Sequence, residues 1–237
     1  DVPERKIHPD AARQVPTLRV QHGTGPDIES VAAAEADLLI LHANFAQFAP
    51  NIRRSLDVPV ALFEITSIDD VAKKLELFGR ITGHAEQADK RIAQLHEEVQ
   101  QVTEGVPTDG PRVLALFGTP EAFFAYRDTS YLGSMLRMLG AENVSSDDPA
   151  FQRMHSVAQL NLEQAIARDP DVILIVPHGP PPAVMGYLTA HPAWGQMRAV
   201  RNGRVHMLDE VLFSSNPGPR VAQAMAELKT LLYAESP

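Results

Sequence analysis

The chain has 237 residues, of which 44% are hydrophobic and 22% charged, with a formal net charge of -9 and no cysteine. This acidic composition argues against nucleic acid as the main partner, and the lack of cysteine excludes disulfides, thiolate metal sites and cysteine nucleophiles. No apolar run approaches the roughly 18–20 residues that span a bilayer. The chain begins at Asp1 in a polar segment without a signal peptide, so we expect a mature or trimmed product.

The first 66 residues predict three strands, each followed by a polar loop. A weak strand is expected at 18–20 and two buried strands at 38–41 and 60–63. Asp27 is placed to cap a short helix between the first two strands. These units predict a small N-terminal lobe.

From Ser67 to about Val102 the apolar residues recur at alternating steps of three and four, as in an amphipathic helix. Ser67 and Asp70 resemble a capping box. Gly79 and Gly83 are expected to split the stretch into two helices, the second about 27 Å long. A coiled coil is the alternative, but the glycine interruptions leave too few heptads for one.

Beyond a turn-rich boundary at 105–111, strands and helices alternate. Strands are expected at 113–117, 172–176 and 205–208, and helices at 131–139, 161–168 and 220–233. This alternation predicts parallel sheets. The predicted fold class is α/β, with two Rossmann-like lobes joined by a single long helix and a ligand cleft between the lobes. The expected segments are an N-terminal lobe at 1–83, a linking helix at 84–104 and a C-terminal lobe at 105–237.

The strand at 172–176 ends abruptly at Pro177-His178-Gly179. Four consecutive branched residues precede it, which is typical of a strand buried on both faces of a parallel sheet. The loop that follows lies at the carboxyl end of the strand, where open α/β sheets bind their ligands. His178 would have little freedom there, as a metal or cofactor ligand requires. The alternative is a loop histidine without such a role.

Further donor side chains each stand singly just past a predicted strand, a pattern that suits a ligand site assembled between two lobes. They are His22, His42, Glu64, His178, Asp209 and Glu210. Each alone is better explained as a solvated loop residue, whereas the set, with three histidines at strand ends, favours a ligand site.

Aromatic loop residues suit a flat apolar ligand, or else they pack the lobes. They are Phe45 and Phe48 in the first lobe and Phe123, Phe124 and Tyr126 in the second. Arg127 is a candidate partner for a ligand carboxylate, or a surface residue. The sequence has no Walker loop, GxGxxG, nucleophile elbow or HExxH, and no acid–base pair can be identified. It therefore favours binding over catalysis.

Several segments carry a resemblance to a known family. They are Ser130–Leu136, Leu139–Val144, Asn161–Glu163, Asp169–Ile173, Asn202–Val205 and Leu208–Glu210 in the second lobe, with Gly25–Glu29 and Asp37–Ile40 in the first. Together they resemble the substrate-binding proteins of iron-complex ABC importers, whose two lobes are joined by a rigid helix. Within that class, Pro177-His178-Gly179 and Leu208–Phe213 are most similar to the haem-binding lipoproteins of staphylococcal-type iron-regulated surface systems.

The resemblance implies that His178 is an axial ligand of haem iron and that a first-lobe methionine is the other. This chain has Thr24 at the methionine's position, and threonine is a poor iron ligand. His22, two residues earlier, is therefore the candidate replacement, and a bis-histidine pair would lower the iron's potential. Aromatic residues, Phe45 and Tyr126 among them, would then sandwich the ring, with Arg127 as a propionate partner.

The resemblance also implies that Glu29 and Glu163, one on each lobe, dock onto basic residues of the permease, although both suit ordinary first-turn helix positions. Proteins of this class begin with a strand and helix upstream of the segment that matches Val2-Pro3. That unit is missing here, so either the chain is trimmed or it is a naturally short form with an exposed sheet edge, through which a homodimer could form.

The sequence thus predicts an extracytoplasmic binding protein, periplasmic or anchored as a lipoprotein, that carries haem to an ABC permease and is not an enzyme. One alternative is a metal-ion, siderophore or cobalamin binder that uses His22, His42, His178 and Asp209 as donors. A second alternative is an α/β enzyme with His178 as general base.

Overall fold

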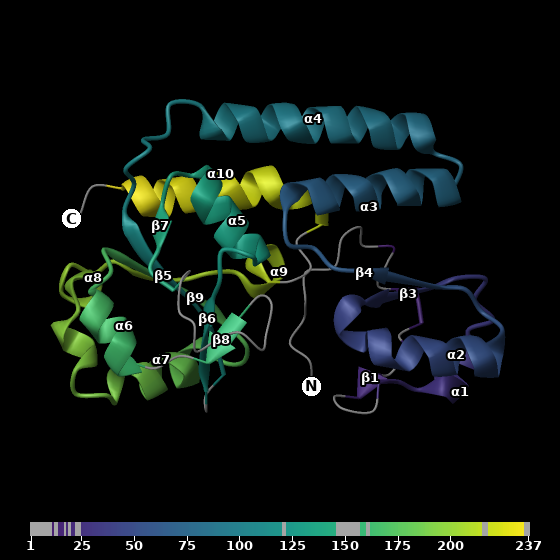
Figure 1. Cartoon of the computed structure of the whole chain (residues 1–237), viewed down its shortest axis with the longest axis horizontal. Coiled ribbons are helices and arrows are strands. Elements are labelled where there is room, and N and C mark those ends of the chain that lie inside the picture. The colour runs from purple at the N-terminus through teal and green to yellow at the C-terminus, as the bar shows by residue number, and fades with distance from the viewer. Residues whose placement is uncertain are drawn as a thin grey trace. The chain divides into compact units, whose positions relative to one another are not determined.

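The computed structural model groups the chain into two compact units, Asp1–Glu64 and Ile65–Pro237 (Figure 1). The residues that the structure describes are 11, 14–16, 18, 20–21, 25–119, 122–145, 157–159, 162–214 and 218–234. Helix α3 (Ile68–Ile81) belongs to the second unit because it packs against α4 (Ala85–Thr103). The boundary between the units therefore precedes residue 83, where the sequence analysis ends its N-terminal lobe.

The first unit is built on two parallel strands, β3 (Leu39–His42) and β4 (Val60–Phe63), with Leu39 opposite Val60. One apolar face of this pair packs against α1 (Ile28–Ala33), η2 (Ala43–Phe48) and α2 (Ala49–Leu56). Asp27 caps α1 as predicted, because its side chain accepts a hydrogen bond from the Ser30 N–H.

A short antiparallel pair, β1 (Val20–Gln21) and β2 (Gly25–Pro26), precedes α1. Gly25 has a φ of +80°, and a Cβ there would lie 2.7 Å from the Phe48 ring, so no larger residue fits. Among the residues that the structure describes, β3 and β4 gain no third strand. Pairing of two chains through this edge stays a prediction.

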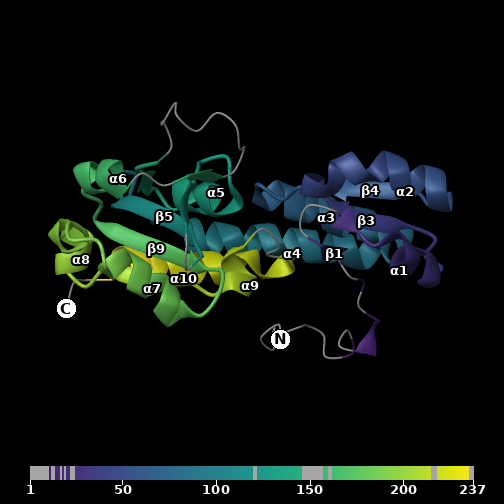
Figure 2. The ribbon, with the colours of Figure 1, turned by 90° about the horizontal axis from the view of Figure 1, so that it is seen from below.

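The second unit contains a six-stranded sheet in the order β10-β9-β5-β6-β8, with β7 added beside β5. Its strands are β5 (Arg112–Gly118), β6 (Phe123–Tyr126), β7 (Glu142–Asn143), β8 (Val157–Gln159), β9 (Val172–Pro177) and β10 (Val205–Met207). The three predicted strands of this unit are confirmed as β5, β9 and β10, and they run parallel. Figure 2 shows β5 and β9 side by side in its left half.

Helices cover both faces of this sheet, as the α/β class requires. One face packs against α3, α4, α5 (Tyr131–Met138), α9 (Glu210–Phe213) and α10 (Val221–Tyr233). The other face packs against α6 (Leu162–Arg168), α7 (Pro181–Thr189), η4 (Trp194–Gln196) and α8 (Arg198–Arg201). A short η5 (Gly218–Arg220) leads into α10.

The long helix α4 lies along both α3 and α10 (Figure 1). Its 19 residues give a length of about 28 Å, close to the predicted helix. The predicted cap of α3 is also confirmed: the Ser67 hydroxyl accepts from the Asp70 N–H, and the Asp70 carboxylate accepts from the Ser67 and Thr66 hydroxyls. In the last turn of α4, the Val102 carbonyl accepts a hydrogen bond from Lys229 Nζ at 2.7 Å, and this contact joins α4 to α10.

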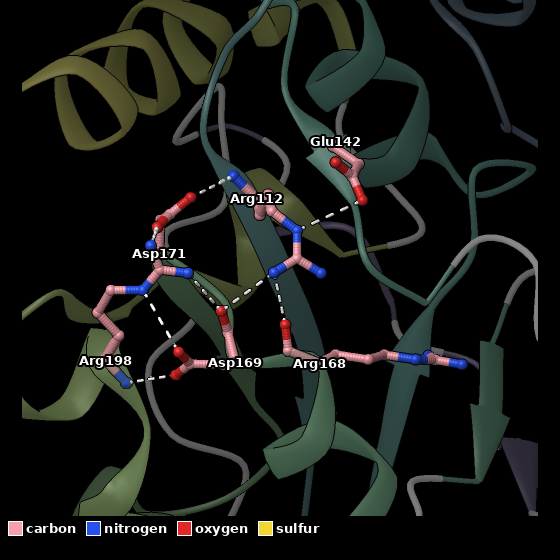
Figure 3. A network of polar contacts seen from close by, with 6 residues as sticks. All are labelled: Arg112, Glu142, Arg168, Asp169, Asp171 and Arg198. Carbon is pink, nitrogen blue, oxygen red and sulfur yellow. Dashed lines mark hydrogen bonds and ion pairs between the residues drawn. The ribbon is translucent and has the colours of Figure 1, made fainter.

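A network of arginines and aspartates pins the amino ends of β5 and β9 (Figure 3). The Asp171 carboxylate accepts from the Arg112 backbone N–H at 3.0 Å and pairs with Arg198 at 2.9 Å. The Arg112 guanidinium donates to the carbonyls of Arg168 and Asp169, at the end of α6. These contacts fix the amino ends of β5 and β9, whereas the loop of His178 follows the carboxyl end of β9.

The sequence analysis was wrong about the segment that follows β5. It places Phe123, Phe124 and Tyr126 in a loop, whereas they form strand β6, which pairs antiparallel with β5 and β8. β5 and β6 form a hairpin, closed by a hydrogen bond from the Thr119 N–H to the Ala122 carbonyl at 2.9 Å. A strand that returns through such a hairpin must run antiparallel. The sheet is therefore mixed, although its α/β class is as predicted.

Within the described ranges, no helix is both long and apolar enough to cross a membrane.

Candidate functional site

His178 stands at the carboxyl end of the most buried strand of the second unit. All six residues of β9 are buried, whereas the His178 side chain keeps 48% of its surface exposed. Its backbone N–H donates to the Gly118 carbonyl at 2.7 Å and so extends the β5–β9 ladder by one residue. The chain then turns away at Gly179, whose φ is +131°, and α7 begins at Pro181. The backbone thus presents the His178 imidazole at the sheet edge, as the sequence predicts.

Glu210 holds one nitrogen of this imidazole. Its Oε1 lies 3.0 Å from His178 Nδ1. Glu210 is the first residue of α9, and the Asp209 carboxylate fixes that helix by accepting from the N–H groups of Val211 and Leu212. A carboxylate at this distance favours a proton on Nδ1, which leaves the Nε2 lone pair available to a ligand.

Three aromatic rings form a row beside His178. The Phe117 ring centroid lies 5.5 Å from the imidazole centroid, with 37° between the ring planes. Phe117 in turn lies 6.4 Å from Phe124 and from Tyr126 of β6, the latter at an edge-on angle of 77°. The sequence analysis missed Phe117. Its position at the end of a predicted strand, like that of His178, is the signal that could have found it.

Tyr126 is a buried phenol near a carboxylate. It is only 8% exposed, and burial, reinforced by the charge of Glu210, raises its pKa well above the ordinary value of 10.0. The phenol therefore stays protonated at neutral pH and supplies an uncharged ring to the aromatic row.

The sequence analysis also proposes Phe123 and Arg127 as ligand contacts, and the structure shows what each of them contacts. Phe123 is 4% exposed and packs in the core on the opposite face of the sheet, so the expectation that it faces a ligand is wrong. Successive residues of a strand point to opposite faces, which separates Phe123 from Phe124. Arg127 follows β6 directly and is half-buried, and its carbonyl accepts from the Ser130 N–H and hydroxyl.

In the first unit, His42 ends β3 and caps η2, where its Nδ1 accepts from the Asn44 N–H at 3.2 Å. Phe45 lies within η2, its ring 6.3 Å from that of Phe48, and both rings pack against the core of this unit. His22 and Thr24, which bear on the second iron ligand, lie outside the described residues.

The two glutamates assigned to permease docking are exposed. Glu29 lies in the first turn of α1 and Glu163 in the first turn of α6. Acidic residues at these positions also favour the helix dipole, so their exposure alone does not assign them a partner.

Across the part of the chain that the structure describes, no group of three or more His, Cys, Asp or Glu residues is arranged to hold a metal ion. Asp209, a donor in the metal-ion alternative, is engaged in capping α9. The site in the second unit is instead one imidazole, one carboxylate and a row of aromatic rings, a set that suits a flat ligand carrying one coordinating atom.

Comparisons with known proteins identify the family and its relatives. Residues 5–212, which extend from the first unit into α9, match the family described as periplasmic binding protein. The high-affinity heme uptake system protein IsdE of Staphylococcus aureus (strain Newman) is 23% identical over 236 residues, which cover 97% of this chain and 78% of that protein.

Solved structures show the same fold. A substrate-binding protein of an ABC transporter from Listeria monocytogenes EGD-e is 25% identical, with a TM-score of 0.77 over 89% of this chain and 81% of the other. The structure of S. aureus IsdE complexed with heme is 23% identical, with a TM-score of 0.76 over 88% of this chain and 81% of the other.

Proposed function

This chain belongs to the periplasmic binding protein family, as a substrate-binding protein of an ABC importer for iron complexes, and we propose that its cargo is haem, which it delivers to a membrane permease. The relatives are binding proteins of transporters and not enzymes, which supports a binding role over a role of His178 as general base. The family implies an extracytoplasmic location, and anchoring through a lipid is part of the proposal.

The observation that carries the proposal is the pair formed by His178 and Glu210. A histidine that binds a metal commonly donates its other ring N–H to a carboxylate, which fixes the tautomer and makes the imidazole a stronger donor to the metal. Glu210 does this at Nδ1, so His178 Nε2 would bind the iron. The half-exposed imidazole at the end of a buried strand supports this role.

The surroundings of His178 suit the rest of a haem. Phe117 and Phe124 offer apolar ring surface to a flat macrocycle, the buried Tyr126 packs edge-on against Phe117, and on the first unit Phe45 would contribute another ring. Arg127 would pair with a propionate, because its guanidinium stays charged and can bind a carboxylate through two hydrogen bonds.

We propose His22 as the second axial ligand, on the ground that Thr24 stands where related haem carriers have methionine. His42, which ends β3 in the first unit, serves as the alternative donor. Glu29 and Glu163 would contact basic residues of the permease once haem is bound.

The experiment is to isolate the protein from cells supplied with haem, and to record its visible spectrum and its metal content. A Soret band with one iron per chain, unchanged after dialysis, is expected. A stoichiometric metal without a Soret band would contradict haem as the cargo and favour a metal ion. His22→Ala is expected to retain haem but to change the iron spectrum, whereas an unchanged spectrum would refute His22 as a ligand.

A further inference from the structure

The aromatic ring of Phe117 packs beside the imidazole of His178. The two ring centroids are 5.5 Å apart and their planes are inclined by 37°. The strand register explains this contact: Phe117 on β5 stands opposite Val176 on β9, and His178 lies two residues beyond Val176. Residues two apart on a strand point to the same face, so both rings lie on one face of the sheet.

Phe117 is itself held in place from the other side. Its cross-strand partner on β6 is Phe124, and Tyr126 meets its ring edge-on from the same strand. Phe117 also packs against the buried core cluster of this face. The Phe117 ring cannot rotate without displacing these neighbours, so it presents a fixed surface to the imidazole of His178.

The contact with Phe117 restrains His178 in a way that Glu210 does not. A single hydrogen bond at Nδ1 tolerates misalignment, so by itself it leaves the imidazole plane some rotation about the Cβ–Cγ bond of His178. A flat ring against one side of the imidazole removes this rotation. The two restraints are therefore complementary, one polar and directional, the other apolar and planar.

We propose that Phe117 is a positioning residue that fixes the plane of the His178 imidazole and thereby the orientation of the axial ligand on the iron. This inference rests on the proposed haem function. The plane of an axial imidazole sets how its π orbital overlaps with the iron d orbitals, and in ferric low-spin haem this overlap shapes the electron paramagnetic resonance (EPR) spectrum. Loss of the Phe117 ring would broaden the EPR spectrum and weaken the iron–imidazole bond.

The test compares three variants loaded with ferric haem. Phe117→Leu keeps an apolar side chain of similar size but removes the flat ring, and Phe117→Tyr restores the ring. Phe78→Leu is the matched control, because it removes an aromatic ring from α3 that contacts the Lys74 ammonium and has no part in the proposed site. The measurements are the EPR g-values and the rate of haem transfer to an excess of a haem-scavenging protein.

Phe117→Leu is expected to shift and broaden the g-values and to speed haem loss roughly threefold to tenfold, as the loss of one aromatic pair implies. Phe117→Tyr, which keeps the ring, should give the wild-type spectrum, and Phe78→Leu should leave the g-values unchanged. If Phe117→Leu does not fold, Phe117→Met, whose flexible side chain fills irregular gaps, is measured in its place.

Two failures can be told apart. If the wild-type protein gives no Soret band with ferric haem, the proposed function fails and this inference fails with it. If wild type binds haem while the ring-deleting variant has the g-values and loss rate of wild type, Phe117 does not position His178, although haem binding stands.

Discussion

Replacement of Gly133 by alanine is expected to destabilise the protein by about 1–3 kcal/mol, the usual cost of overpacking a rigid site. Gly133 lies in the first half of α5, where a Cβ would press against the Arg127 carbonyl oxygen and lie 2.7 Å from Asp128 Cα. These are backbone atoms of the turn that joins β6 to α5, so no side-chain rotation relieves the overlap. Alanine's better helix propensity, worth up to about 1 kcal/mol, offsets only part of this cost.

Gly186 of α7 provides the matched control, because it is also helical but has no atom within 4 Å of an added Cβ. Gly186→Ala should therefore stabilise by about 0.5–1 kcal/mol. In a thermal melt followed by circular dichroism, a loss of about 2 kcal/mol lowers the Tm of a chain this long by roughly 4–8 °C. A Tm of Gly133→Ala equal to or above that of wild type would refute the close approach of α5 to the turn.

Three further predictions follow from the contacts described above. Glu210→Gln should weaken haem affinity about fivefold relative to the exposed-site control Glu97→Gln. A buried hydrogen bond to a charged group contributes about 1.5–3 kcal/mol, and the exposed fractions of 48% for His178 and 33% for Glu210 reduce this contribution to about 1 kcal/mol. Equal affinities of the two variants in a haem titration would contradict the pairing of His178 with Glu210. Burial raises the pKa of the Asp70 carboxyl, but hydrogen bonds from neighbouring hydroxyls outweigh the effect of burial and hold the pKa below 3.8. The ionised Asp70 carboxylate therefore stabilises the fold above pH 3.8, and this stabilisation is lost as the pH falls through the folded-state pKa. Urea unfolding of wild type should accordingly lose stability more steeply below pH 4 than unfolding of Asp70→Asn, whereas parallel curves would show that Asp70 is not responsible. Charge reversal of Glu29 and Glu163 together should abolish haem uptake by cells and leave haem binding intact, with Glu97→Lys as the control; unchanged uptake would remove both from the permease interface.

The sequence predicts best those elements whose burial leaves a local pattern. Strand β9 is recognisable because both of its faces are buried, which requires an unbroken apolar run. Helices α3 and α4 are recognisable from their period and from the Ser67 cap. Strand β6 has no such mark, because its pairing depends on the hydrogen bond between Thr119 and Ala122 and on the partner strand β5, neither of which its own residues specify.

The candidate site follows the same rule. His178 is predicted because it ends a recognisable strand, and Glu210 is noted only as one of several scattered donors. Their contact joins residues 32 apart in the sequence, and it exists because β10 pairs with β9 and delivers α9 beside the His178 loop. The contact with Phe117 likewise depends on the β5–β9 register. Contacts set by the pairing of distant strands leave no local signature, so the sequence indicates the histidine but not the residues that hold it.

The most direct test of haem binding through His178 is a titration of the apoprotein with ferric haem, followed at the Soret band. His96→Ala serves as the matched control, because His96 is exposed on α4. Wild type and His96→Ala are expected to saturate at one haem per chain with a sharp Soret band. His178→Ala should bind at least tenfold more weakly, with the spectrum of an iron that has lost an axial imidazole. Identical titrations and spectra for all three proteins would contradict the assignment of His178 as the iron ligand.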